Sequence, residues 1–403
     1  MTHLDARGAA TRTGDRSRPR AALPALCATQ ITSWGIVYYA FPVLNARITA
    51  DTGWSTTTTT AAFSAALLVS ALAGIPVGRI LDERGPRAVM TTGSLLGVAA
   101  VLAIAYAPNL AVFTGAWLLA GVAMAATFYQ PAFAALTRWW GTDRIRALTI
   151  VTLAGGLAST VFAPLTATLA EHLSWRTTYA VLAALLAAIT VPAHALALRA
   201  PWPPPPRHSA QQTAVGTPVA RSRHFLLLAA ALTLNGFAMY AVVFALVPLL
   251  MERGAGPTVA AWALGLGGAG QTLGRTLYAR LARHSTVTTR TVALIAAGGA
   301  TTTALALVHG PIPLLVALAI AAGMIRGNLT LLQATAVTDR WGATHYGRLS
   351  GLLLAPATIA AALAPWAATC LATALGGYPP LFLALAVASA AAGVLASQTS
   401  TKR

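Results

Sequence analysis

The chain consists of long apolar stretches separated by short polar ones. The hydrocarbon core of a bilayer requires about 20 apolar residues per helix, and twelve stretches approach or exceed that length. Uniformly apolar runs of this kind predict membrane-spanning helices and an all-α membrane protein. The twelve predicted spans are 23–45, 58–79, 88–107, 110–136, 147–170, 177–198, 224–251, 258–280, 290–308, 312–337, 348–375 and 378–396.

Three segments are too polar to span. Residues 1–22 are rich in arginine and lack the apolar core and cleavage site of a secretory signal, so we expect a disordered cytoplasmic tail. Residues 199–223 contain a run of prolines and several arginines, which favours an extended cytoplasmic linker. Residues 397–403 form a second tail. The linker separates two halves of six spans each, 23–198 and 224–396.

The two halves repeat each other. Adding 201 to a position in the first half often finds a matching residue in the second, without gaps. This constant shift predicts a duplicated six-helix unit. Parallel halves of this kind are a transporter architecture, in which substrate binds between the halves near the membrane midplane. The matches include Trp140-Gly141 with Trp341-Gly342, Gly35 with Gly236, Tyr39 with Tyr240, Leu148 with Leu349, and Pro164 with Pro365.

Composition agrees with a membrane protein. The chain is 57% hydrophobic, with 9% charged residues and a mean hydropathy of +0.68, whereas a soluble domain has about 25% charged residues. The net charge of +18 falls in the gaps between apolar runs and forms no basic face, which argues against nucleic-acid binding. The predicted partners are therefore the lipid bilayer and a small molecule.

The sequence lacks the signatures of an enzyme. It has no His/Cys/Asp cluster with metal spacing, no Gly-x-Ser-x-Gly and no phosphate loop, so we expect no catalytic residues, metal or cofactor, and no ATP-driven transport. Cys27 and Cys370 lie in apolar runs and imply no disulfide.

The basic residues predict the orientation. Beyond the predicted tails and linker, one side carries many arginines, while the other has only Arg47, Arg176 and Arg253. The richer side is cytoplasmic, together with both termini. We therefore predict a monomeric, multi-pass protein of the plasma membrane, specifically a bacterial inner membrane. The arginines of the cytoplasmic gaps are Arg84, Arg87, Arg138, Arg144, Arg146, Arg280, Arg283, Arg290, Arg340 and Arg348.

A charged stretch, residues 78–87 (GRILDERGPR), lies between the second and third spans. Ser70, Gly74 and Gly78 precede it at every fourth position, so another helix can approach this face closely. An ordinary positive turn is the simpler interpretation. However, the stretch resembles the loop signature of the major facilitator superfamily. The resemblance implies a role in gating for its matching residues and their basic neighbours: Gly78, Asp82, Arg84, Gly85, Arg87 and Arg138.

Shorter motifs resemble bacterial members that are similar to monocarboxylate transporters and oxalate/formate antiporters. They are Asp51-Thr52-Gly53-Trp54-Ser55, residues 129–133 (YQPAF), Ser174-Trp175-Arg176 and Gly274-Arg275. This resemblance implies a carboxylate substrate held by Arg275. The chain departs from the pattern at Gln271, where eukaryotic carriers have aspartate, and at Arg326-Gly327-Asn328, where bacterial relatives often have acidic residues.

Polar residues within the spans are candidates for substrate binding. By analogy with the superfamily, spans 1, 4, 7 and 10 line the cavity, and spans 3, 6, 9 and 12 face lipid. Helix packing and interhelical hydrogen bonds are the alternative roles for these side chains. The candidates are Tyr38, Tyr39, Tyr129, Gln130, Asn235, Tyr240, Gln271, Arg275, Arg326, Asn328 and Gln333.

The two arginines are the strongest candidates. A charge near the bilayer centre costs about 2.5–3.5 kcal/mol, and Arg326 lies well inside its span, whereas Arg275 is nearer an end and can reach the interface. None of the nine acidic residues lies in the middle of a predicted span. An arginine without a protein carboxylate is suited to binding an anionic substrate; solvation by water and helix carbonyls is the alternative.

We therefore predict a secondary active or facilitative transporter of a small, monocarboxylate-like organic anion, working by alternating access. An efflux transporter for amphipathic drugs or metabolites is the main alternative, and a transport-related membrane sensor is less favoured. Without a buried acid, we expect anion exchange, facilitated movement, or proton coupling through His194 or the substrate.

Overall fold

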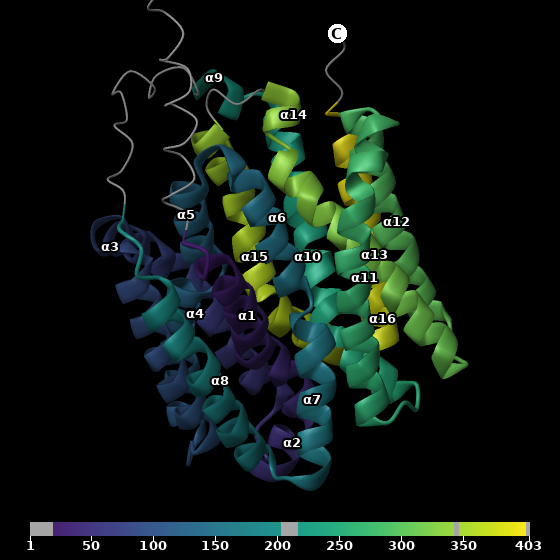
Figure 1. The fold of residues 1–403 in the computed structure, drawn as a ribbon. Helices are drawn as coiled ribbons and strands as arrows, with labels where there is room; N and C mark the ends of the chain where they lie inside the picture. Colours follow the sequence, from purple (N-terminus) through teal and green to yellow (C-terminus); the bar gives the residue numbers. More distant parts are fainter. Residues whose placement is uncertain (1–18, 203–216, 342–345, 400–403) are drawn as a thin grey trace, which may run out of the picture.

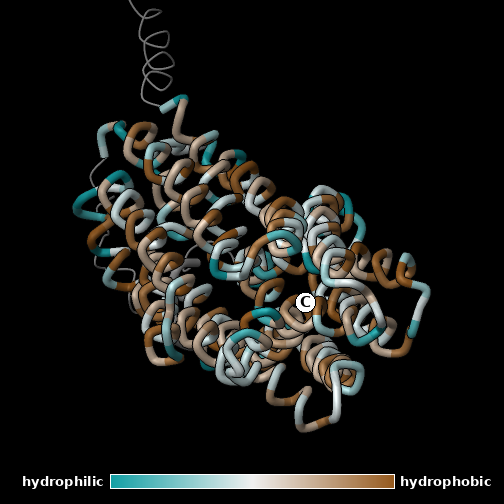
Figure 2. Tube along the Cα trace, turned by 90° about the horizontal axis from the view of Figure 1, so that it is seen from below, coloured by the Kyte–Doolittle hydropathy of each residue, from teal (hydrophilic) through white to brown (hydrophobic). Residues whose placement is uncertain are grey.

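A computed structural model describes residues 19–202, 217–341 and 346–399, and in these ranges the regular structure is helical. The helices form two groups, purple to teal for the first half and green to yellow for the second (Figure 1). White and brown colours dominate the helices, as expected for surfaces that contact lipid (Figure 2). Most of the predicted linker and tails lies outside the described residues, so the predicted domain boundaries remain predictions.

The first half has six spans, several of them built from more than one helix. The third helix of the chain is long enough to contain two spans. The bounds are α1 Ala22–Trp34, the π-helix η1 Gly35–Tyr39 and α2 Ala40–Thr52 for span 1; α3 Thr56–Ala105 for spans 2 and 3; α4 Leu110–Thr127 and α5 Tyr129–Trp140 for span 4; the short η2 Gly141–Asp143; α6 Arg144–Gly156 and α7 Ala158–His172 for span 5; and α8 Trp175–Ala197 for span 6.

The second half has six spans, each a single helix. They are α10 Arg223–Glu252, α11 Pro257–Arg283, α12 Val287–Leu307, α13 Ile312–Thr335, α15 Tyr346–Leu375 and α16 Tyr378–Ser397. The short helix α9 Thr217–Ala220 precedes α10, and the short helix α14 Thr338–Trp341 lies between α13 and α15. Nine helical segments in the described ranges are long and apolar enough to cross a membrane when α4 is joined to α5 and α6 to α7. Counting α3 twice and adding span 1 and the glycine-rich α11 gives the twelve predicted spans.

The charged stretch is not the multi-residue turn that the sequence suggested. Helix α3 continues through it, and Gly85 is its one residue with non-helical backbone angles, φ 75° and ψ 170°. A positive φ strains residues that carry a Cβ, so glycine is required at this reversal. Pro86 then opens the next helical segment, where its missing N–H costs nothing. Asp82 and its neighbours therefore belong to the end of span 2.

Helix breaks distinguish the two halves. Span 1 contains a π-helical segment, span 4 is interrupted at Phe128, which has extended backbone angles, and span 5 is interrupted at Leu157. Their counterparts α10, α13 and α15 are continuous. The sequence repeat therefore does not extend to local backbone geometry.

The halves are joined from the middle of the membrane to the outer side. Helix α7 packs against α11, and α15 packs against α3. The Trp366 amide donates to Ser64 Oγ at 3.1 Å, and Thr258 donates to the Glu171 carboxylate. The hydrogen bonds described between the halves extend inward as far as Arg275 and Thr152, each eight residues from the cytoplasmic end of its helix, and none is described closer to that end. The outer side is therefore sealed in this conformation.

Candidate functional site

Two adjoining cavities lie between the halves. The arginine chamber, of about 160 Å³, is lined by Trp34, Tyr38, Tyr39, Tyr129, Gly155, Gly156, Met239, Tyr240, Val243, Gln271, Arg275, Arg326 and Thr330. The apolar chamber, of about 250 Å³, is lined by Trp34, Tyr38, Leu67, Ser70, Ala71, Met124, Ala125, Phe128, Tyr129, Gln130, Tyr240, Thr358, Ala361 and Ala362. Four aromatic residues, Trp34, Tyr38, Tyr129 and Tyr240, line both.

The chambers use more helices than expected. Spans 1, 4, 7 and 10 contribute, as predicted, but spans 2, 5, 8 and 11 contribute as well. Spans 3, 6, 9 and 12 supply no residue to either chamber. The central space is therefore enclosed by four helices from each half.

Most of the predicted binding residues meet at these chambers. Gln130 lines the apolar chamber, whereas Asn235 borders a separate cavity of about 40 Å³ inside the second half, which it shares with Arg326. Asn328 and Gln333 line neither chamber, and Asn328 donates to the Met324 carbonyl of its own helix at 3.0 Å. The predicted binding residues that line the arginine chamber are Tyr38, Tyr39, Tyr129, Tyr240, Gln271, Arg275 and Arg326.

Close packing of α11 on α13 positions the arginine chamber. A Cβ added at Gly323 would overlap the Gly267 carbonyl, one at Gly327 would overlap the Gln271 carbonyl, and Gly274 faces the α13 backbone in the same way. Small residues at such crossings let two helix backbones approach. As a result, Arg326 Nη2 lies 3.4 Å from Gln271 Oε1.

The two arginines differ in their partners. Arg275 is 8% exposed and donates to the Thr152 carbonyl of the other half. Arg326 is only half-buried, and its contact with Gln271 is at the long limit for a hydrogen bond. Most of the Arg326 donors therefore remain available in the chamber, which makes it the stronger ligand candidate. Arg326 lies nine residues from the end of α13 and Arg275 lies eight residues from the end of α11, so both are too deep to reach the interface easily, and Arg275 is deeper than the sequence suggested.

No carboxylate neutralises these arginines within the described ranges. The acidic side chains there lie near helix ends, where Asp51 accepts from Trp175 Nε1 at 2.9 Å and Glu252 accepts from the Tyr378 amide at 3.0 Å. Asp82 and Asp339 pair with other arginines. The arginine chamber therefore carries positive charge that an anion can balance.

Trp34, Phe128 and Tyr129 form an aromatic wall beside the chambers, and its geometry depends on the break in span 4. Pro131 has no N–H, so it leaves the Thr127 carbonyl without its helical partner. Gln30 Nε2 donates to that carbonyl at 2.7 Å and to the Phe128 carbonyl at 3.3 Å. Phe128 then stacks on Trp34, with ring centroids 4.1 Å apart. The break thus directs aromatic side chains toward the chambers.

Replacing Gln30 by leucine should disturb this wall. Leucine has a similar size but cannot donate, and an unsatisfied buried carbonyl costs about 1–3 kcal/mol. We expect the Gln30→Leu melting temperature to fall and substrate affinity to fall with it. Thermal unfolding of the purified protein measures the melting temperature. The control is Gln398→Leu, which makes the same replacement at the end of α16. Equal melting temperatures for Gln30→Leu and wild type would contradict the role of this amide.

The chain contains further site residues that the sequence reasoning missed. The Tyr129 hydroxyl lies against Gly155, and Arg275 Nη1 would be 3.1 Å from a Cβ at Gly156. These glycines make room for both side chains. The sequence did offer a signal, namely two consecutive glycines within an apolar span. Each glycine destabilises a helix by about 1 kcal/mol relative to alanine, so a pair of them indicates that space is needed at that point.

The signature stretch lies at the cytoplasmic end of the same helices. The Asp82 carboxylate pairs with Arg138, and the Arg138 guanidinium lies 4.3 Å from the Trp202 ring centre. Trp202 Nε1 also donates to the Asp82 carbonyl at 3.0 Å. Arg87 Nε donates to the Ala195 carbonyl at 2.9 Å. A cavity of about 190 Å³ runs from Gln130 to Asp82 beside this cluster.

Comparison with known proteins identifies the family. The family description Major Facilitator Superfamily matches residues 26–311, more than half of the chain. The chain belongs to the Major Facilitator Superfamily. No curated protein sequence matches it significantly. As a member of this superfamily it is a transporter and not an enzyme, and its fold supports transmembrane transport by alternating access.

Solved structures confirm the superfamily fold. A bacterial homologue of the human lysosomal transporter Spinster, in an inward-facing and unoccupied conformation, shares 14% sequence identity over 96% of this chain and 98% of its own, with a TM-score of 0.77. The superfamily transporter FucP, in an outward conformation, shares 15% over 95% of this chain and 100% of its own, with a TM-score of 0.64.

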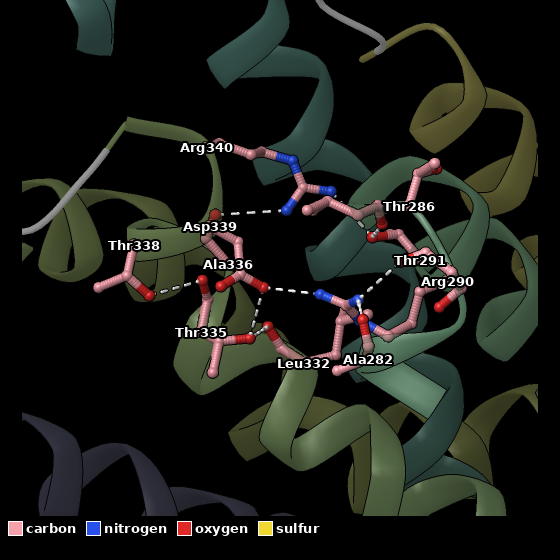
Figure 3. Close-up of polar contacts among 12 residues, drawn as sticks. Ala282, Thr286, Arg290, Thr291, Leu332, Thr335, Ala336, Thr338, Asp339 and Arg340 are labelled. Atoms are coloured by element: carbon pink, nitrogen blue, oxygen red, sulfur yellow. Dashed lines mark hydrogen bonds and ion pairs between the residues drawn. The ribbon is translucent and has the colours of Figure 1, made fainter. Parts of the chain in front are cut away.

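The second half of this superfamily member has its own cytoplasmic cluster (Figure 3). Arg290 Nη2 lies 2.7 Å from Asp339 Oδ2, and Arg340 Nη2 donates to Thr291 at 2.8 Å. The repeat shift of 201 places Asp339 opposite Arg138. The same shift places Asp82 opposite Arg283, whereas the partner of Asp339 is Arg290, so the ion pair of the second half does not repeat that of the first.

The small-residue face of span 2 is covered by the Gln130 side chain at Gly74 and is uncovered at Gly78. Gly74 and Gly78 line the cavity that leads to Asp82, and a Cβ at Gly78 would meet nothing within 4 Å. The helix approach predicted for this face therefore does not occur at Gly78 here. Asp82 pairs with Arg138 of its own half, another of the residues for which the resemblance implies a gating role. The side chain of Arg348, at the amino end of α15, lies outside the described residues.

We expect Asp82→Asn to weaken closure of the cytoplasmic side. The Asp82 side chain is 57% exposed, so its ion pair contributes at most about 1 kcal/mol and the melting temperature should change little. Cysteines placed in the cytoplasmic cavity should nevertheless label faster, because asparagine loses the attraction to the positive amino end of α15 that we expect Asp82 to make when the cytoplasmic side is closed. The matched control is Glu83→Gln, which removes an adjacent exposed carboxylate. Identical labelling rates in the two variants would reject the gating role.

Proposed function

We propose that this superfamily member carries a small, monocarboxylate-like organic anion across the plasma membrane by exchange or facilitated movement. The observation that supports the proposal is the position of Arg326. Its guanidinium faces a chamber between the halves without a carboxylate partner in the described ranges. A carboxylate can form two parallel hydrogen bonds with such a guanidinium.

The location of the chamber suits alternating access. Arg326, Arg275 and Gln271 come from the second half, whereas Tyr38, Tyr39 and Tyr129 come from the first. An anion held by the arginines would contact both halves at once. The contacts on the outer side and access from the cytoplasmic side both depend on how the two halves meet. Binding of the anion between the halves would therefore be coupled to the rocking of one half against the other.

His194 is a poor candidate for proton coupling. Its Nδ1 lies 2.8 Å from Ser94 Oγ, its side chain is fully buried, and it lines neither chamber. We therefore expect transport to continue without a pH gradient when a counter-anion is supplied, unless the substrate itself carries the proton.

Reconstituted vesicles test the proposal. We expect the purified protein to take up at least one member of a panel of radiolabelled monocarboxylates, with stimulation by unlabelled carboxylate on the opposite side. Empty vesicles and the Arg326→Gln variant provide the controls. Uptake of none of the panel, or equal uptake by wild type and variant, would overturn the anion proposal.

The aromatic residues favour a second candidate, efflux of amphipathic compounds. Trp34, Phe128 and Tyr129 form a continuous group, with centroids 4.1 Å and 5.3 Å from Trp34. Such faces also bind cations. Uptake of an amphipathic amine into inverted vesicles, unaffected by Arg326→Gln, would favour efflux over the carrier function proposed above.

A further inference from the structure

We propose that the substrate is a monoanion with an apolar body, whose carboxylate binds in the arginine chamber while its body occupies the apolar chamber. The inference rests on the proposed function and adds the shape and charge of the substrate. The observation that carries it is that the two chambers adjoin and share Trp34, Tyr38, Tyr129 and Tyr240.

The two chambers differ sharply in chemistry. The arginine chamber has two guanidinium groups and the Gln271 amide. The apolar chamber is lined mainly by aliphatic and aromatic residues, its uncharged polar groups include Ser70, Gln130 and Thr358, and tyrosine is the one ionisable residue type in its lining. A ligand that spans both chambers must therefore be charged at one end and apolar at the other.

The charges favour a single carboxylate. Arg275 donates from Nη1 to the Thr152 carbonyl, and its buried Nε has no partner among the described residues, so both guanidinium groups can bind one carboxylate in the arginine chamber. A second carboxylate on the far end of the ligand would enter the apolar chamber without a cation to pair with. Burying such a charge is strongly unfavourable.

The volume sets the size of the apolar body. A cavity of roughly 150 Å³ with apolar walls accommodates benzene, and the apolar chamber measures about 250 Å³. It therefore has room for one six-membered ring or a chain of comparable bulk. The shared aromatic faces favour a planar body, which can stack on Trp34.

A homologous series of acids tests the inference on the full-length purified protein. Thermal stabilisation reports the affinity of acetate, butyrate, hexanoate, octanoate and benzoate. Each buried methylene should improve affinity about three- to fourfold, so hexanoate should bind on the order of a hundredfold more tightly than acetate. Affinity should stop rising once the chamber is full.

Two compounds matched to hexanoate test the charge. Adipate has the same chain length and a second carboxylate, and it should bind far more weakly than hexanoate. Hexylamine has a cation in place of the carboxylate and should not bind measurably. Tighter binding of adipate or hexylamine than of hexanoate would overturn the inference.

Two variants and one control variant locate the apolar body. Ala361→Phe fills the apolar chamber and should reduce hexanoate affinity at least tenfold while acetate affinity stays the same. Ala374→Phe adds the same ring to an exposed position of α15 outside the chamber and should behave as wild type. Leu67→Ala enlarges the chamber and should move the best chain length upward, a gain that a folding defect cannot mimic.

The outcomes separate this inference from the proposed function. Equal affinity for acetate and hexanoate, with Arg326→Gln still reducing both, would overturn the apolar chamber and leave the anion carrier intact. Absence of binding by every acid would overturn both. An unchanged preference for hexanoate in Ala361→Phe would also reject the placement of the apolar body.

Discussion

Arg326→Gln should nearly abolish anion transport, while Arg326→Lys should weaken it. A hydrogen bond to a charged group contributes about 1.5–3 kcal/mol, which corresponds to roughly a ten- to hundredfold change in affinity. Glutamine removes the charge and the guanidinium together. Lysine keeps the charge but cannot form two parallel bonds to a carboxylate. Initial uptake rates at several substrate concentrations give both the affinity and the maximal rate.

Arg280→Gln is the matched control for this experiment. Arg280 lies on α11, near the cytoplasmic end, and is exposed, so the variant loses the same charge outside the chambers. It should transport like wild type. If Arg326→Gln inserts normally into the membrane and transports the anion with unchanged affinity, Arg326 is a structural residue and the anion proposal loses its main support.

Phe244→Ala should open the outer side of the transporter. The Phe244 ring lies 6.0 Å from Phe41 and 6.1 Å from Phe63, measured between centroids, and all three residues are buried. Phe41 and Phe63 belong to the first half and Phe244 to the second. Their contact therefore exists while the outer ends of the halves are together and is lost when they separate.

The expected shift in the conformational equilibrium can be calculated from the burial of the Phe244 side chain. Truncating a buried phenylalanine to alanine costs about 3–5 kcal/mol. If about 2 kcal/mol of that belongs to contacts across the halves, the equilibrium shifts toward the outward-facing state roughly thirtyfold. Cysteines placed on the outer side of the chambers should then react faster with a membrane-impermeant reagent.

The matched control for Phe244 is Phe382→Ala. Phe382 is fully buried on α16, and α16 packs against α10, α12 and α15 of its own half. Its truncation should lower stability without changing the labelling rate. Equal labelling rates in the two variants would show that the aromatic contact is not a seal.

The sequence was sufficient to predict the number of spans, the repeat and the superfamily. These properties depend on the length of apolar runs and on short motifs such as residues 78–87, because the bilayer requires each span to satisfy its own backbone hydrogen bonds. It also predicted most residues of the arginine chamber, since polar side chains within apolar runs are few. The monocarboxylate subtype remains a proposal.

The tertiary structure decided how those residues are arranged. Arg275 and Arg326 are far apart in the sequence, and they meet because glycines let α11 and α13 approach each other. Likewise, no periodicity shows that Gln30 would bind the carbonyl that Pro131 leaves free. Conversely, Asn328 and Gln333 lie on the predicted helix but away from both chambers.

The physical reason for this division is the range of the interactions. Spanning a bilayer depends on the hydropathy of about 20 consecutive residues and is therefore visible in the sequence. Which face of a helix meets which partner depends on close packing between segments that can be a hundred residues apart, as in Gln30 with Thr127 and Arg275 with Thr152. Only the folded chain brings these groups within bonding distance, so only the tertiary structure reveals the chambers.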